Sequence, residues 1–243
     1  MFVQSYYQQV SGILAAVFDQ EAGRIQQAGE MLAETFRQGG MLYVFGCGHS
    51  HMFAEELFYR AGGLAPVYPM FDTAAMLHDG AKKSSYVERS SGYAAQILER
   101  YPIGQKDCIL LVSTSGINSL IIEMALGAKA RGAKVIGISS LLYMTHASRQ
   151  ADGLHLPQCC DLCIDNHVPE GDAVVPVCQD GTKAGPVSTV VTASIVNAMA
   201  LSACESLKAS GVEPEVFRSG NCPGADEYNA ALFDKYMHRV RHL

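Results

Sequence analysis

The chain has 243 residues, of which 49% are hydrophobic and 17% are charged, and its formal net charge is -6. This length and composition exclude intrinsic disorder and fit one α/β domain with added helices. The Lys and Arg residues are scattered without a basic stripe, so we expect no nucleic-acid partner and no anionic membrane partner.

The eight cysteines are interpreted as reduced thiols, because a chain this long and core-rich does not need disulfides. Residues 1–7 lack a basic segment ahead of an apolar stretch, so we expect no signal peptide. We also expect no membrane span, since no apolar run approaches roughly 20 residues. These features predict a cytoplasmic protein.

Apolar spacing predicts two N-terminal helices over 3–38, broken near Asp19, with Gly39 and Gly40 ending the second. Residues 70–86 and 166–184 are expected to be irregular. The rest alternates between strands at 41–45, 64–68, 108–112, 135–139 and 162–165 and helices at about 50–60, 87–101, 119–130, 147–151, 189–209 and 226–240.

This alternation predicts an α/β fold, with a doubly wound, five-stranded parallel sheet between two helical layers. We expect helices in 1–38 to pack on a core domain at 39–210, followed by a tail and helix at 211–243. Ligands of such sheets bind outside the carboxyl ends of the strands.

The first motif at such an end is the turn Gly46-Cys47-Gly48-His49-Ser50. It does not fit the dinucleotide fingerprint, because His51 stands where a third Gly or Ala is needed and no acidic residue follows at the usual distance. No Gly-Lys-Ser/Thr sequence is present either. We therefore predict no nucleotide cofactor. A tight turn with a capping Ser50 hydroxyl remains, and an ordinary strand-to-helix turn is the alternative.

The second motif, Ser113-Thr114-Ser115-Gly116-Ile117-Asn118-Ser119, follows the strand at 108–112. Helix capping needs one such residue, and the surplus of hydroxyl groups favours anion binding. A third cluster, Gly185-Pro186-Val187-Ser188-Thr189, precedes the long apolar helix, where a plain N-cap is the alternative.

These three motifs together resemble the sugar isomerase (SIS) phosphosugar-binding domain over roughly residues 38–208. Residues 48–63 are similar to a single-domain SIS group of uncharacterised phosphosugar-binding proteins, which matches along the whole length. The resemblance implies a flavodoxin-like sheet and a homodimer or homotetramer. It also implies that a phosphorylated sugar, which can be an amino sugar, binds at the strand ends. The phosphate and sugar contacts expected from the motifs are Gly48, His49, Ser50, Ser113, Thr114, Ser115, Asn118, Ser188 and Thr189.

Aldose–ketose isomerisation moves a proton between adjacent carbons, which requires a base and an acid near the sugar. Glu88 is the first candidate for the base, because similar SIS isomerases place a carboxylate in this region. A helix-terminal Glu stabilised by the helix dipole is the alternative. His78 lies in a segment that resembles arabinose-phosphate isomerases and is the candidate for ring opening. Glu55 and Glu56 are further candidates, since one of two adjacent residues can face the site.

The leading hypothesis is a phosphosugar isomerase; a non-catalytic phosphosugar sensor and a sugar-ether lyase remain as alternatives. Glu170-Gly171-Asp172 resembles an acidic loop of other SIS isomerases, but a solvated turn is the preferred explanation, because these residue types are common in loops. His155, Cys159, Cys160 and Cys163 only superficially resemble a zinc motif, since Cys163 lies within a strand. We therefore predict no metal site.

Overall fold

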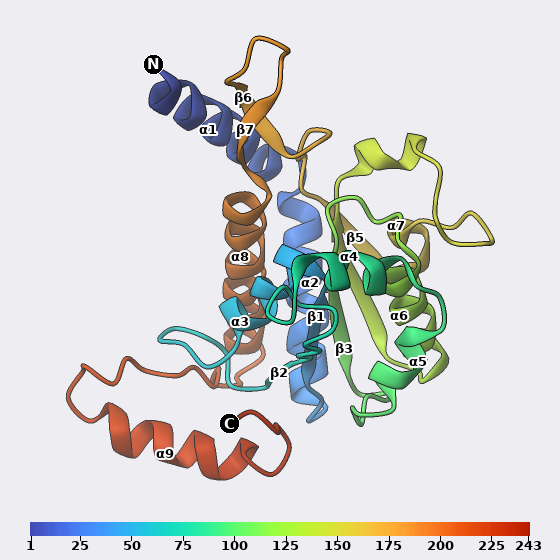
Figure 1. Ribbon diagram of the computed structural model, residues 1–243. Helices are drawn as coiled ribbons and strands as arrows, with labels where there is room; N and C mark the ends of the chain where they lie inside the picture. The colour runs from blue at the N-terminus through green and yellow to red at the C-terminus, as the bar shows by residue number, and fades with distance from the viewer.

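Five parallel strands form the centre of the molecule, which a computed structural model describes over residues 1–243 (Figure 1). The strand order is β2-β1-β3-β4-β5. The strands are β1 (Leu42–Gly46), β2 (Val67–Pro69), β3 (Cys108–Val112), β4 (Lys134–Ser139) and β5 (Leu162–Asp165). The predicted α/β class and the five-stranded parallel sheet are confirmed.

The strands are apolar because both faces of the sheet are covered. Alternate residues of a strand point to opposite faces, so Leu42 and Val44 belong to one hydrophobic cluster and Tyr43 and Phe45 to the other. All five residues of β1 and all five of β3 are buried. The core therefore consists of two layers, one on each side of the sheet.

Helices form the outer layers, as predicted (Figure 1). One face carries α2 (Ala22–Arg37), α3 (Met52–Leu57) and α8 (Ser188–Ala209). The other face carries α5 (Tyr93–Leu98), α6 (Ser119–Ala130), α7 (Leu156–Cys159) and, through Leu232 and Tyr236, α9 (Ala225–Tyr236). The remaining helices are α1 (Phe2–Gln20) and α4 (Ala81–Arg89), and η1 (Gly48–His51) and η2 (Leu141–Thr145) are 3-10 turns.

Helix α8 is long and apolar enough to span a membrane by length and composition alone. The expectation that no apolar stretch reaches this length is therefore wrong. Val191, Ile195 and Met199 of α8 are nevertheless fully buried in the cluster that covers the sheet. The helix is long and apolar because it is a core helix packed on α2 and the strands.

Three predicted segments differ in the structure. Residues 70–86 are not wholly irregular, because α4 begins at Ala81, and the helix expected at 87–101 is divided by Gly92, whose φ is +83°. The segment 147–151 is not helical. The segment 166–184 is not all loop, since β6 (Ala173–Pro176) pairs with β7 (Lys183–Pro186).

The hairpin β6–β7 escaped prediction because its second strand is rich in Gly and Pro. It is stabilised from outside, where the Tyr6 hydroxyl of α1 donates a hydrogen bond to the carbonyl of Pro186 at 2.9 Å. In Figure 1 the hairpin and the N-terminal part of α1 extend together from the body of the molecule.

Candidate functional site

The turns that follow β1 and β3 start side by side. These strands are neighbours in the sheet, and Gly46 is in register with Val112, the last residue of β3. The chain winds away from this pair in both directions, to β2 on one side and to β4 and β5 on the other. Ligands of doubly wound sheets bind at such a reversal of strand order. The two predicted anion-binding motifs therefore share one edge of the sheet.

The first turn folds back tightly on its own start. A Cβ atom on Gly46 would lie only 2.4 Å from the carbonyl oxygen of Ser50, so the turn requires glycine at this position. The amide of Gly48 donates to the carbonyl of Ala75 at 2.9 Å, which ties the turn to the segment before α4. His49 is exposed and Ser50 half-buried, so both are within reach of a ligand.

The second turn is closed by its own serine. The amide of Gly116 donates to Oγ of the buried Ser113 at 3.1 Å. Gly116 has a φ of +61°, and a Cβ there would lie 2.7 Å from Oγ of Ser139. Thr114 and Ser115 are half-buried and follow directly. Ser113 thus shapes the turn, while the next two hydroxyl groups lie at its surface.

Asn166 belongs to this edge of the sheet, although we did not single it out from the sequence. It is fully buried, and its side-chain amide donates to Oγ1 of Thr114 at 3.4 Å. Its position directly after the predicted strand 162–165 was the available signal, because ligands gather at strand carboxyl ends.

Hydrogen bonds between side chains hold Glu88 beside the second turn. Nδ2 of Asn118 donates to Oε1 of Glu88 at 2.6 Å, and a guanidinium nitrogen of Arg149 donates to Oδ1 of the same amide at 2.6 Å. Both polar atoms of the buried Asn118 are therefore engaged. Arg149 was missed because a short helix was expected around it. It brings a cation to a turn that otherwise offers only neutral donors.

The charge of Glu88 also reaches the first turn. Burial, with smaller contributions from the negative charges of Glu88 and Asp72, raises the pKa of the Cys47 thiol well above its usual value. Cys47 therefore stays a neutral thiol and is a poor nucleophile. The carboxylate of Glu88 lies beside the second turn.

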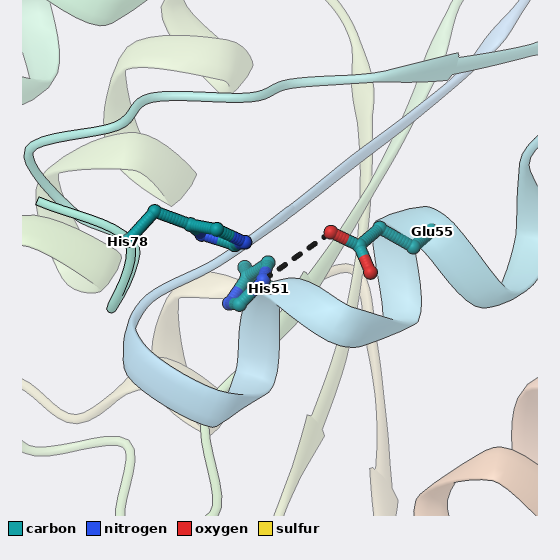
Figure 2. A group of neighbouring side chains, drawn as sticks. All are labelled: His51, Glu55 and His78. Atoms are coloured by element: carbon teal, nitrogen blue, oxygen red, sulfur yellow. Dashed lines mark ion pairs between the residues drawn. The ribbon is translucent and has the colours of Figure 1, made fainter.

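His78 lies in a different group, with His51 and Glu55 (Figure 2). The rings of His51 and His78 are 5.1 Å apart between centroids and meet at 71°. Nε2 of His51 is 3.3 Å from Oε1 of Glu55, one helical turn further on. An open pocket of about 360 Å³ is lined by these three residues with His49, Met52 and Leu77.

The two adjacent glutamates of α3 face different partners. Glu55 points toward His51 (Figure 2). Oε1 of Glu56 instead accepts a hydrogen bond from Nδ2 of Asn197 on α8 at 2.8 Å and forms an ion pair with Arg60. Of the two, Glu55 is the one that lies beside the first turn.

The third predicted cluster is occupied by a carboxylate of the chain itself. Oδ1 of Asp172 accepts hydrogen bonds from the amides of Val187 and Ser188 at 2.9 and 2.7 Å. Oδ2 of Asp172 accepts from the Ser188 hydroxyl at 2.7 Å. Asp172 thus caps the N-terminal end of α8. Phosphate binding by Ser188 and Thr189 stays a prediction from the sequence.

The segment with a superficial zinc spacing is engaged in the fold. Nε2 of His155 lies 2.9 Å from the carbonyl of His146, and His155 caps α7. The thiol of Cys160 donates to the carbonyl of Leu156 at 3.2 Å. His155 and Cys160 therefore both contact backbone carbonyls of the fold.

Comparison with known proteins identifies relatives of the chain. A family model described as "SIS domain" matches residues 5–140. A UPF0309 protein of Halalkalibacterium halodurans is 41% identical over 239 residues, which cover 98% of this chain and 96% of that protein. A UPF0309 protein of Geobacillus thermodenitrificans matches to the same extent.

Solved structures with the same fold are more distant in sequence. A phosphoheptose isomerase from Neisseria gonorrhoeae has a TM-score of 0.55 at 15% identity, with 83% of this chain and 95% of that chain covered. A phosphoheptose isomerase from Francisella tularensis has a TM-score of 0.54 at 17% identity, with coverages of 85% and 96%. The Vibrio vulnificus NanR protein, complexed with ManNAc-6P, has a TM-score of 0.50 at 14% identity, with coverages of 100% and 70%.

Proposed function

The chain belongs to the SIS domain family, and we propose that it binds a phosphorylated sugar between the turns after β1 and β3 and isomerises it. The observation that carries the proposal is the carboxylate of Glu88, held beside the second turn by Asn118. Solved SIS-fold proteins in complex with phosphosugars support this class of ligand.

The phosphate site of the proposal is the turn from Ser113 to Ser119. Thr114 and Ser115 supply hydroxyl donors, and the N-terminal end of α6 supplies amide donors and a favourable dipole. The guanidinium of Arg149 adds a positive charge at the same turn. Ser50 and His49, on the neighbouring turn, would then contact the phosphate or the sugar.

Glu88 acts as the base of the proposed reaction. Its carboxylate takes the proton from the carbon next to the carbonyl, and the resulting enediol takes a proton back on the adjacent carbon. Asn118 orients the carboxylate by donating to Oε1, so Asn118 is a positioning residue. His78, in the pocket beside the first turn, is the proposed acid and base for ring opening.

A phosphosugar sensor without catalysis is the second candidate. The Vibrio vulnificus NanR protein, complexed with ManNAc-6P, supports phosphosugar binding, which the sensor and the isomerase share. The fold serves both uses, so the chemistry at Glu88 must decide between them. A sugar-ether lyase would also use a carboxylate base, and its products would differ from those of an isomerase.

Glu88→Gln tests the catalytic proposal. We expect this variant to lose at least 100-fold of the exchange of a carbon-bound proton with deuterated solvent, since general bases contribute typically 10²–10⁴-fold. Thermal stabilisation by the phosphosugar should persist, because Gln keeps the side-chain volume and the contact with Asn118.

The matched control is Glu99→Gln. It neutralises the exposed carboxylate of Glu99, the residue that directly follows α5. Stabilisation without any exchange in the wild-type protein would favour the sensor. Exchange that survives in Glu88→Gln would exclude Glu88 as the base.

We further propose that the protein is cytoplasmic and forms a homodimer or homotetramer. All eight cysteines are free thiols, as a reducing compartment requires. Phe2 and Tyr7 on α1 and Leu201 on α8 are 63%, 64% and 71% exposed, and contact with a second copy would cover such side chains. Light scattering of the purified chain measures the oligomeric state directly.

A further inference from the structure

His51 is buried in a defined tautomeric state at the junction of η1 and α3. Its side chain is only 8% exposed, and Nδ1 lies within hydrogen-bond distance of the carbonyl of Gly48. A carbonyl oxygen only accepts, so Nδ1 carries the ring proton. In the neutral imidazole, Nε2 is then left with a free lone pair.

That lone pair faces a carboxylate. Nε2 of His51 lies 3.3 Å from Oε1 of Glu55, and both atoms are acceptors when the imidazole is neutral. The contact is favourable only with a positive charge between the two atoms, which is either a proton on Nε2 or a metal ion. A proton would account for the contact between His51 and Glu55, but it would involve no third residue.

His78 brings a third donor atom to the same point. One ligand atom from each of His51, Glu55 and His78 lies within 4.8 Å of the others (Figure 2). His78 comes from the segment between β2 and α4, whereas the other two lie on η1 and α3. A metal ion uses all three groups, which a single proton does not.

We propose that His51, Glu55 and His78 bind one divalent transition-metal ion of the zinc class. Two imidazoles and a carboxylate suit zinc or cobalt, while magnesium and calcium prefer oxygen ligands throughout. A tetrahedral ion with bonds of about 2.0–2.2 Å separates its ligand atoms by about 3.4 Å. The pair of His51 and Glu55 already has this spacing, and the ligand atom of His78 lies within 4.8 Å of both.

The surroundings of the site match those of a zinc site. Metal-binding histidines donate their second ring N–H to a carbonyl or carboxylate, which fixes the tautomer, and Gly48 does this for His51. Three protein ligands leave a fourth position open, as in catalytic zinc sites. The pocket that the three ligands line is also lined by His49, on the turn that we propose for sugar binding.

This site shares His78 and its pocket with the proposed function, but it is tested with a different probe, the metal ion alone. In the metal-bound protein, His78 is a ligand of the ion. The ion would then supply the polarisation of a sugar oxygen that the metal-free protein assigns to His78.

The test is a titration of the full chain with zinc alone after treatment with a chelator. Metal content by mass spectrometry and competition with a chromophoric chelator give the stoichiometry and the affinity. We expect one equivalent in the wild type. Binding should weaken at least tenfold in His78→Ala and in Glu55→Gln, since even the loss of an outer-shell partner costs about 10–100-fold.

His238→Ala is the matched control, because it removes an exposed histidine after α9. It should keep the full equivalent. Free thiols also bind zinc, so the titration is repeated with cobalt, whose absorption spectrum distinguishes thiolate ligands from nitrogen and oxygen ligands. Unfolding curves verify that each variant is folded, and both ligand changes are at exposed side chains.

Failure of the wild type to take up zinc, or unchanged zinc binding in folded His78→Ala, would overturn the proposal. Stabilisation by a phosphosugar, measured in the chelator-treated protein, reports separately on the proposed function.

Discussion

Gly116 determines the shape of the second turn. Its φ of +61° is a conformation that residues with a Cβ adopt at a cost, and Oγ of Ser139 occupies the space that a Cβ would need. The glycine therefore allows the amide at 116 to reach Oγ of Ser113 and close the turn. The sequence pattern indicated an anion site here, but not the internal use of Ser113.

Gly116→Ala is therefore expected to destabilise the protein by about 2 kcal/mol or more and to abolish phosphosugar binding. Gly153→Ala is the control, because Gly153 has a φ of +76° with open space around it. Denaturant unfolding should show a larger loss for Gly116→Ala. Equal losses would mean that only the backbone conformation matters and that the close contact with Ser139 does not.

Contacts between residues that are far apart in the chain could not be predicted from the sequence. The spacing of His51 and Glu55 is visible in the chain, since residues four apart share a helix face. The approach of His78 depends on the path of the segment after β2, which has no periodic pattern. In the same way, the contacts of the Asn118 amide with Glu88 and Arg149 could not be predicted from the sequence, and a contact of Asn118 with the ligand stays a prediction.

At the scale of elements, the apolar strands were predictable and the polar helix α4 was not. β3 and β5 have the predicted bounds because both are short apolar runs between polar residues. β2 is shorter than predicted, since the apolar Leu64 bridges to Val216 instead of β1. α4 begins with Ala81-Lys82-Lys83 and has little apolar periodicity, so it is stabilised by contacts such as that of Ser84 with the carbonyl of Ala75 at 2.7 Å.

The cap of α8 gives a prediction at this scale. Asp172→Ala removes three hydrogen bonds at the N-terminal end of the helix and should destabilise the protein by about 1–2 kcal/mol. Asp172→Asn should cost less, because it keeps the acceptor for the two amides and because Asn tolerates the φ of +65° at this position. Thermal unfolding measures both variants. Equal stability of Asp172→Ala and the wild type would contradict the cap.

At the scale of the whole molecule, three buried tyrosines make the free energy of unfolding depend on pH in the alkaline range. Burial, assisted by nearby charges, raises the pKa of Tyr43 and Tyr236 and raises the pKa of Tyr101 to about 12. In the unfolded chain these phenols ionise near pH 10. The folded protein therefore binds more protons than the unfolded chain between about pH 10 and 12, and its stability must fall over this range.

We expect the free energy of unfolding to decrease steadily above pH 10, where these phenols ionise in the unfolded chain. Tyr101→Phe should flatten this decrease, because the residue can no longer ionise in the unfolded chain. It should also cost about 1 kcal/mol at neutral pH, since the hydroxyl donates to the carbonyl of Phe71 at 3.1 Å. Denaturant titrations across this pH range measure both effects, and an identical slope in Tyr101→Phe would exclude this tyrosine as a cause.

The central claim is a phosphosugar site between the turns after β1 and β3, and ligand-induced thermal stabilisation tests it most directly. A series of sugar phosphates is compared with the same sugars without phosphate, on the wild type, on Ser115→Ala and on the control Ser85→Ala, an exposed serine of α4. At 100 times its Kd, a matching sugar phosphate should raise the Tm of the wild type and of Ser85→Ala by roughly 5–10 °C. The unphosphorylated sugar should have no effect, and Ser115→Ala should respond less. If no phosphorylated sugar stabilises the wild type, or if Ser115→Ala responds as strongly, the site is not where we place it.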